Sequence, residues 1–176
     1  MVKKRIDRLS PGGGKTEIIF VDSNIFVLDL RYKKDKDYHV NKSFLDSLYE
    51  KKTGIISIFN LLEICGILCF SLNEKQVLEL YHYLPDKYRV EIIPSPLMEL
   101  SLPQLAVRKV FEIICRKVRF GYALIISIVE TYVPHITHFI SWDAIHFKNK
   151  ISASTSPRVL TPEEFLKEDT SGKRQI

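Results

Sequence analysis

Three acidic residues follow apolar segments of the kind that form buried strands. Asp22 follows the apolar run 18–21, Asp143 follows 138–142, and Glu63 lies in the expected helix after another such run. Because the carboxyl ends of parallel strands meet at one edge of a sheet, we expect the three carboxylates to converge there. Such carboxylates repel one another unless a cation lies between them, and Mg²⁺ or Mn²⁺ suits an all-oxygen site. The pattern predicts metal-dependent phosphoryl-transfer chemistry.

Apolar runs and helical periodicity alternate along the chain and predict the elements that position these acids. The expected strands lie at 17–22, 55–58, 88–93, 138–142 and 158–160. The expected helices start at 23, 41, 60, 73, 97, 121 and 162, and the one at 97–119 has a break at Pro103. Gly54 is interpreted as the C-cap of the helix at 41–50, and Asn73 as an N-cap. Strands that alternate with helices predict an α/β fold with a parallel sheet.

Length and composition indicate one globular domain. The chain has 176 residues, of which 45% are hydrophobic and 27% charged, and this is an ordinary globular composition. We expect a basic flexible tail at 1–16, one domain at 17–167 and a polar tail at 168–176. With no apolar run of about 18 residues and no signal peptide, a cytoplasmic protein is expected.

The net charge of +5 favours polyanionic partners such as nucleic acid. Besides the N-terminal residues, one segment is markedly basic and is our candidate for RNA contact: Arg108, Lys109, Arg116, Lys117 and Arg119. The same segment also fits the solvent-facing side of an amphipathic helix. A flavodoxin-like nucleotide-binding module is a weaker alternative, because no glycine-rich phosphate loop follows the first strand.

Four segments, in order and at consistent spacing, resemble the PIN-domain family, which includes small ribonucleases and the toxins of VapBC-type toxin–antitoxin pairs. They are Val-Asp-Ser-Asn at 21–24, Asn-Leu-Leu-Glu-Ile at 60–64, Ile-Ser-Trp-Asp-Ala-Ile-His-Phe at 140–147 and Val-Leu-Thr-Pro-Glu-Glu-Phe-Leu at 159–166. The resemblance covers about residues 17 to 167. Each segment alone is a weak signal, but the four together are fairly specific.

The resemblance implies a three-layer α/β/α fold with a central parallel sheet of four or five strands. Asp22, Glu63 and Asp143 would hold Mg²⁺ or Mn²⁺, with Asn24 and Ser141 as hydrogen-bonding supports. The metal would activate water for hydrolysis of RNA. It also implies a protein partner such as an antitoxin, and a homodimer. From the residues alone, Asp22 and Asp143 could instead be helix caps, and Glu63 a solvated helical residue.

One position departs from the family pattern. The segment Gly-Tyr-Ala-Leu-Ile at 121–125 places Tyr122 where the family usually has an Asp. A tyrosine is neutral at pH 7 and is a poor ligand for Mg²⁺. Glu130 would lie roughly 12 Å further along the helix, and Glu99 lies in another segment. A non-catalytic PIN domain that binds RNA or protein, with Tyr122 stacking on a base, is therefore the alternative function.

Overall fold

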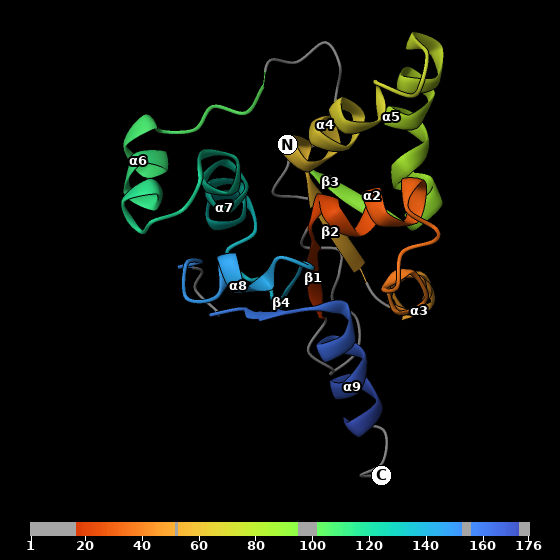
Figure 1. The fold of residues 1–176 in the computed structure, drawn as a ribbon. Coiled ribbons are helices and arrows are strands. Elements are labelled where there is room, and N and C mark those ends of the chain that lie inside the picture. The colour runs from red at the N-terminus through yellow and green to blue at the C-terminus, as the bar shows by residue number, and fades with distance from the viewer. Residues whose placement is uncertain (1–16, 52, 95–101, 153–155, 173–176) are drawn as a thin grey trace.

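The computed structural model describes residues 17–51, 53–94, 102–152 and 156–172. Its centre is one sheet of five strands, in which every pair of neighbours is parallel. The strand order is β3-β2-β1-β4-β5. The strands are β1 (Ile18–Val21), β2 (Thr53–Ser57), β3 (Val90–Ile93), β4 (His138–Ile140) and β5 (Arg158–Leu160). The expected α/β class and parallel sheet are confirmed (Figure 1).

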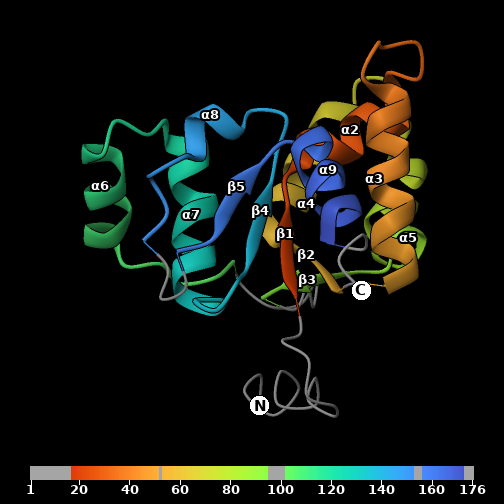
Figure 2. The ribbon, with the colours of Figure 1, turned by 90° about the horizontal axis from the view of Figure 1, so that it is seen from below.

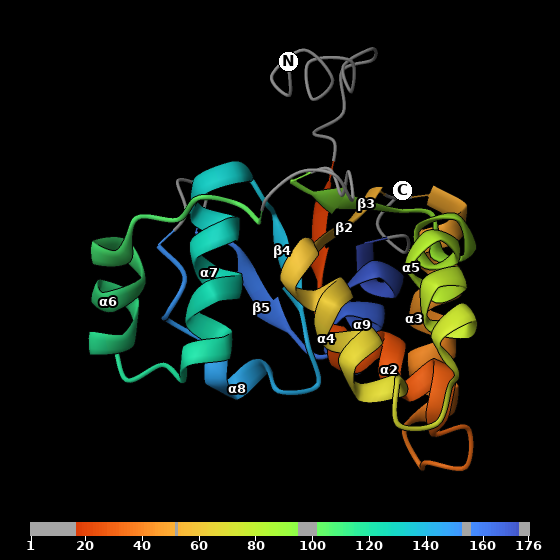
Figure 3. The ribbon, with the colours of Figure 1, turned by 90° about the horizontal axis from the view of Figure 1, so that it is seen from above.

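Eight helices in the described part of the chain cover the two faces of the sheet. Figures 2 and 3 show α6, α7 and α8 on one side and the other helices on the opposite side, which makes three layers. The helices are α2 (Ser23–Arg31), α3 (Tyr38–Lys51), α4 (Ile58–Leu68), α5 (Glu74–Tyr88), α6 (Val107–Cys115), α7 (Phe120–Tyr132), α8 (Ala144–Phe147) and α9 (Pro162–Gly172).

Alternation along the strands divides the apolar core between these two faces. Ile19 and Val21 of β1 belong to the cluster that includes residues of α2, α3, α4, α5 and α9. Phe20, which lies between them, points to the other face and stacks on Phe139 with ring centroids 4.9 Å apart. Successive strand residues point to opposite faces, so an unbroken apolar run fits a strand that is buried on both sides.

Local capping signals are confirmed at two helices. The Asn73 side chain accepts from the backbone of Gln76, and the Gln76 side chain accepts from the backbone of Asn73, which completes a capping box at the start of α5. At α9, Thr161 and Glu164 exchange the same pair of bonds, at 2.7 and 3.2 Å. Such reciprocal bonds satisfy backbone N–H groups that a helix start leaves unpaired.

The interpretation of Gly54 as a helix cap is wrong. Gly54 lies inside β2, where it pairs with Ile19 on one side and Val90 on the other. A Cβ atom at this position would lie 2.9 Å from Val90 Cγ1. The absence of a side chain therefore permits close packing of two strands and does not serve a turn.

Two other boundaries also differ from the prediction. The long helix expected at 97–119 is reduced to α6, since residues 102–106 are not helical and 95–101 lie outside the described residues. Tyr88, expected in the third strand, is the last residue of α5 and is followed by Arg89 in the left-handed conformation, with φ at 50°. The Tyr88 hydroxyl donates to Asp29 Oδ2 at 2.6 Å in the core. This tertiary contact outweighs the strand preference of an aromatic residue.

The strand order makes β1 the point at which the chain changes direction across the sheet. From β1 the chain proceeds to β2 and β3 on one side, and then returns to place β4 on the other side of β1. Ligands of open α/β sheets bind outside the carboxyl ends of the strands at such a switch point. The last helix, α9, continues to Gly172 and so includes part of the segment 168–176. Within the described ranges, no helix has the length and apolar character needed to cross a membrane.

Candidate active site

Asp22 is held by neutral hydrogen-bond donors at the carboxyl end of β1. Its backbone N–H donates to Ile140 O of β4 at 2.9 Å, which continues the strand pairing by one residue. Its Oδ1 accepts from the backbone N–H of Ser23 at 2.8 Å and from Asn60 Nδ2 at 2.9 Å. Its Oδ2 accepts from Ser141 Oγ at 2.7 Å. Asp22 is also the N-cap of α2, so the capping role and the site position coincide.

The buried position of Asp22 makes its ionised form costly. The residue is only 2% exposed. Burial raises the pKa of Asp22 to about 6 from its ordinary 3.8, and the negative charge of Glu63 acts in the same direction. Hydrogen bonds from Ser141 and Ser23 lower the pKa but do not cancel the effect of burial. A carboxylate in this state would gain stability from a nearby positive charge.

Glu63 reaches the same site from α4. Ser23 Oγ lies 2.6 Å from Glu63 Oε2 and 3.3 Å from Asp22 Oδ1. A hydroxyl has one proton to donate, and the shorter distance indicates that Glu63 receives it. One serine therefore joins the carboxylate at the N-cap of α2 to a carboxylate in the middle of α4.

Ser141 links Asp22 to the third acidic residue. Its hydroxyl donates to Asp22 Oδ2 and accepts from Asn24 Nδ2 at 3.0 Å and from the backbone N–H of Asp143 at 2.9 Å. Asn24 Oδ1 in turn accepts from the backbone N–H of Trp142 at 3.3 Å. Asn24 and Ser141 thus lie beside Asp22 and orient the segment that leads to Asp143.

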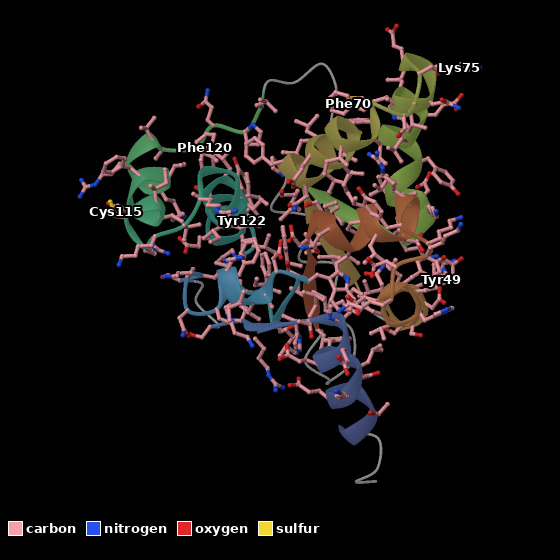
Figure 4. All side chains as sticks on the ribbon, viewed as in Figure 1. Tyr49, Phe70, Lys75, Cys115, Phe120 and Tyr122 are labelled. Carbon is pink, nitrogen blue, oxygen red and sulfur yellow. The ribbon has the colours of Figure 1, made fainter. Side chains whose placement is uncertain are left out.

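The Asp143 side chain is bound by Tyr122. Tyr122 Oη donates to Asp143 Oδ2 at 3.1 Å. The Tyr122 ring stacks on His146 with centroids 5.9 Å apart and contacts Phe147 at 4.7 Å. Burial, followed by the negative charge of Asp143, raises the pKa of Tyr122 to about 12, so the phenol keeps its proton at neutral pH. Figure 4 labels Tyr122 between α7, which contains it, and α8, whose N-cap is Asp143.

The chemistry of the oxygen donors determines how well a divalent cation fits. Carboxylates with hydroxyl and amide oxygens are the ligands preferred by Mg²⁺ and Mn²⁺. Among the residues that the structure describes, however, no group of three or more His, Cys, Asp or Glu side chains is arranged to hold a metal ion. Asp22 and Glu63 share a hydroxyl, whereas Asp143 is engaged by the phenol. The donor set fits a cation at Asp22 and Glu63, with Asp143 set apart.

Sequence reasoning missed the polar residues that support the carboxylates. Asn60 is fully buried and donates to Asp22, and Ser57 Oγ both accepts from the Asn60 backbone at 3.1 Å and donates to the Asn60 side chain. Ser23 and His146 were also absent from the prediction. A serine that ends a strand three residues before a polar residue is a capping pattern, and this pattern was the available signal for Ser57 and Asn60.

Most of the basic segment is engaged in ion pairs. Arg116 Nη1 lies 2.8 Å from Glu130 Oε1, and Lys109 Nζ lies 3.8 Å from Glu130 Oε2. Arg108 pairs with Glu112 on the exposed side of α6. Two further members, Lys117 and Arg119, are exposed. Glu130 is committed to these pairs and does not replace an acid at Tyr122, and Glu99 lies outside the described residues.

Comparisons with known proteins agree with this architecture at the level of fold. No family model matches the chain, and no curated protein matches it. A chain in the crystal structure of VapBC2 from Rickettsia felis, bound to a DNA fragment from the promoter, is 18% identical with a TM-score of 0.52. The match covers 82% of this chain and 98% of that chain.

A second solved structure is VapC20 from Mycobacterium tuberculosis, described as a sarcin-ricin loop cleaving toxin. It is 12% identical over 69% of this chain and 86% of that one, with a TM-score of 0.46. The first structure, together with the five-stranded parallel sheet and its two helical layers, identifies the fold. The chain has the PIN-like fold that its sequence motifs predicted.

Proposed function

We propose that this protein is a divalent-metal-dependent endoribonuclease that hydrolyses RNA at the edge formed by Asp22, Glu63 and Asp143. The observation that supports this most is the hydrogen-bond network of two serines. Ser23 joins Asp22 to Glu63, and Ser141 joins Asp22 to the backbone of Asp143. Two acids thus share a hydroxyl, and the backbone of the third is bonded to the same network, in the region where an open α/β sheet binds its ligands.

In this proposal the carboxylates of Asp22 and Glu63 hold Mg²⁺ or Mn²⁺. When bound, the cation supplies an activated water and neutralises charge on the phosphate oxygens. Asn60 and Ser141 fix the orientation of Asp22 through the bonds to its two oxygens. Asn24 holds the Ser141 hydroxyl, and so keeps its proton directed toward Asp22.

We further propose that RNA phosphates bind the exposed members of the basic segment. Lys117 and Arg119 lie in the segment between α6 and α7, and Tyr122 lies in the first turn of α7. Arg108 is exposed beside Glu112, while Lys109 and Arg116 are shared with Glu130. Phosphate contacts of this kind weaken with added salt, so cleavage should slow as salt is raised.

A cleavage assay with matched variants tests this function. The wild-type protein should cut single-stranded RNA with Mn²⁺ and should stop cutting when EDTA is added. Asp22→Asn should lower the cleavage rate by about a hundredfold or more, because it removes a charged metal ligand. Asp46→Asn is the control, since Asp46 lies on the exposed side of α3, where it pairs with Lys42. Equal rates for wild type and Asp22→Asn would contradict the proposal.

A second candidate function is that of a non-catalytic PIN domain that binds RNA or protein. Tyr122 favours it, because a neutral phenol engages Asp143 where the family pattern has an acid. In this case the protein would bind an RNA oligonucleotide equally well with Mn²⁺ and with EDTA, and would not cut it. A gel-shift titration read beside the cleavage assay distinguishes the two functions.

We also propose a protein partner, either a small antitoxin-like chain or a second copy. The similar chain from Rickettsia felis belongs to a VapBC2 assembly. Here Val107 and Phe111 lie one turn apart on α6 and are 83% and 63% exposed, and large exposed apolar residues that are grouped often mark interfaces. Light scattering after size-exclusion chromatography measures whether the purified chain is a monomer or a dimer.

A further inference from the structure

Tyr122 and Asp143 form a pair that the proposed metal chemistry does not explain. The phenol donates to Asp143 Oδ2 at 3.1 Å, and the charges of both Asp143 and Asp22 raise the pKa of the phenol. The Tyr122 hydroxyl thus occupies one of the two carboxylate oxygens that Asp143 could offer to a cation.

The ring of Tyr122 is held by two other aromatic rings. Phe147, which is fully buried, contacts it at 4.7 Å between centroids, and His146 stacks on it with an interplanar angle of 26°. Phe147 packs in turn on Phe139 of β4 at 4.5 Å. Because this stack connects to the sheet, the phenol cannot leave Asp143 without a shift of its ring.

The hydroxyl of Ser23, which touches Asp22 and Glu63, differs in kind from that of Tyr122. Ser23 Oγ can rotate its proton away from Glu63 and still offer an oxygen to a cation between Glu63 and Asp22. Tyr122 instead carries a bulky ring into the site, and a neutral phenol is a poor partner for Mg²⁺ or Mn²⁺. A cation and the phenol proton therefore compete for Asp143, but they do not compete in the same way for Glu63.

We propose that Tyr122 is a positioning residue that withholds Asp143 from the cation, so that the resting site binds a divalent ion through Asp22 and Glu63 only. This inference rests on the proposed metal-binding function and specifies it further. The hydrogen bond from Tyr122 to Asp143 thereby sets the affinity of the site for the metal ion. When the phenol releases Asp143, the third carboxylate joins the other two.

Calorimetric titration with Mn²⁺ at neutral pH tests the inference without relying on activity. Tyr122→Phe keeps the ring stack and removes the donor, so it should bind Mn²⁺ about tenfold more tightly, the effect expected for one hydrogen bond to a charged group. Asp143→Asn alone should change the affinity less than twofold. The double variant Tyr122→Phe/Asp143→Asn should lose the whole gain.

Tyr132→Phe is the matched control, because Tyr132 is the last residue of the same helix and should leave the affinity unchanged. Tyr122→Leu, which also lacks the hydroxyl, replaces Tyr122→Phe if the latter does not fold. Equal Mn²⁺ affinity in wild type and Tyr122→Phe, or an equal gain when Asp143 is replaced, would overturn the inference and leave the proposed function intact. Absence of Mn²⁺ binding in every variant would overturn the proposed metal chemistry as well.

Discussion

Asp22 and Glu130 are both nearly buried carboxylates, and their surroundings differ. The Glu130 side chain is 6% exposed and lies beside two cationic side chains, those of Arg116 and Lys109. Asp22 is 2% exposed and accepts only from hydroxyl, amide and backbone groups. A buried charge is tolerated when it is paired. The first site carries its counter-charge within the chain, whereas no cationic side chain of the described residues is bonded to Asp22.

The presence or absence of a cationic partner distinguishes an acid with a structural role from a candidate functional acid. The ion pairs of Glu130 connect the end of α6, α7 and the segment after α8, since Arg116 also donates to Lys150 O and the Ser152 backbone donates to Glu130. Asp22 connects β1 with β4 and α4, but at the cost of a raised pKa. Perturbed acids of this second type concentrate at functional sites.

The largest expected effect comes from breaking the pair around Glu130. Arg116→Met would leave the more distant Lys109 as the remaining cationic partner of Glu130. The free energy of unfolding should therefore fall by about 2–3 kcal/mol. Urea denaturation measures this loss. Arg108→Met is the matched control, because its exposed pair with Glu112 should contribute less than about 0.5 kcal/mol. Equal losses for both variants would remove the distinction between the two kinds of acid.

Neutralising Asp22 should raise the free energy of unfolding, whereas breaking the ion pair of Glu130 should lower it. In the folded state the pKa of Asp22 is raised from 3.8 to about 6, so the folded protein holds the proton more strongly than the unfolded chain. The associated stability is present below pH about 4 and is lost as the pH rises through about 6. The Asn side chain of Asp22→Asn does not titrate. Without metal at pH 8, the free energy of unfolding of this variant should therefore exceed that of wild type by about 1–2 kcal/mol.

The pH dependence provides the check on that prediction. The gain from Asp22→Asn should shrink toward zero as the pH is lowered to about 4, where the wild-type carboxyl is protonated as well. Thermal unfolding in EDTA across this range measures it. A gain that is constant with pH would mean that burial of the charge is not its cause.

An external cation should replace the partner that Asp22 lacks. At a Mn²⁺ concentration ten times its Kd, wild type should gain about 1.4 kcal/mol from binding to the folded state. The gain should be larger at pH 8 than at pH 5, because protonated Asp22 binds metal poorly. Scanning calorimetry with and without Mn²⁺ measures this, and Asp22→Asn should show no comparable shift.

The smallest expected effect separates two buried serines. Ser141 uses its hydroxyl in three hydrogen bonds, whereas the hydroxyl of Ser127, within the described residues, has no partner. Ser127→Ala should therefore raise the free energy of unfolding by about 0.5–1 kcal/mol. Ser43→Ala on the exposed side of α3 should change it by less. A loss of stability in Ser127→Ala would show that this hydroxyl has a partner in solution.

Local sequence signals predicted the fold well where one element determined its own ends. The strand before Asp22, the N-cap at Asn73 and the start of α9 at Pro162 all lie where the sequence predicted them. Prediction was wrong where a contact from another part of the chain determined the boundary. Gly54 lies in a strand because Val90 packs against it, and Tyr88 stays in a helix bonded to Asp29.

The candidate site also has a part that the sequence could predict and a part that it could not. Sequence position was enough to propose that Asp22, Glu63 and Asp143 meet at the sheet edge, because acids at strand ends converge. It could not show that Ser23 joins two of them or that Tyr122 binds the third. Such contacts depend on side-chain directions at helix starts far apart in the chain, which no local pattern records.

The position of β4 beside β1 has a consequence during synthesis of the chain. Ser141 bonds to Asp22 across 119 positions of sequence, so the two halves of the acid network are made at different times. A nascent chain that has released β1, β2 and α4 from the ribosome still lacks the strand that supplies Ser141 and Asp143. The proposed RNA-cutting site, built in this order, would therefore stay incomplete until β4 and the residues after it have left the ribosome.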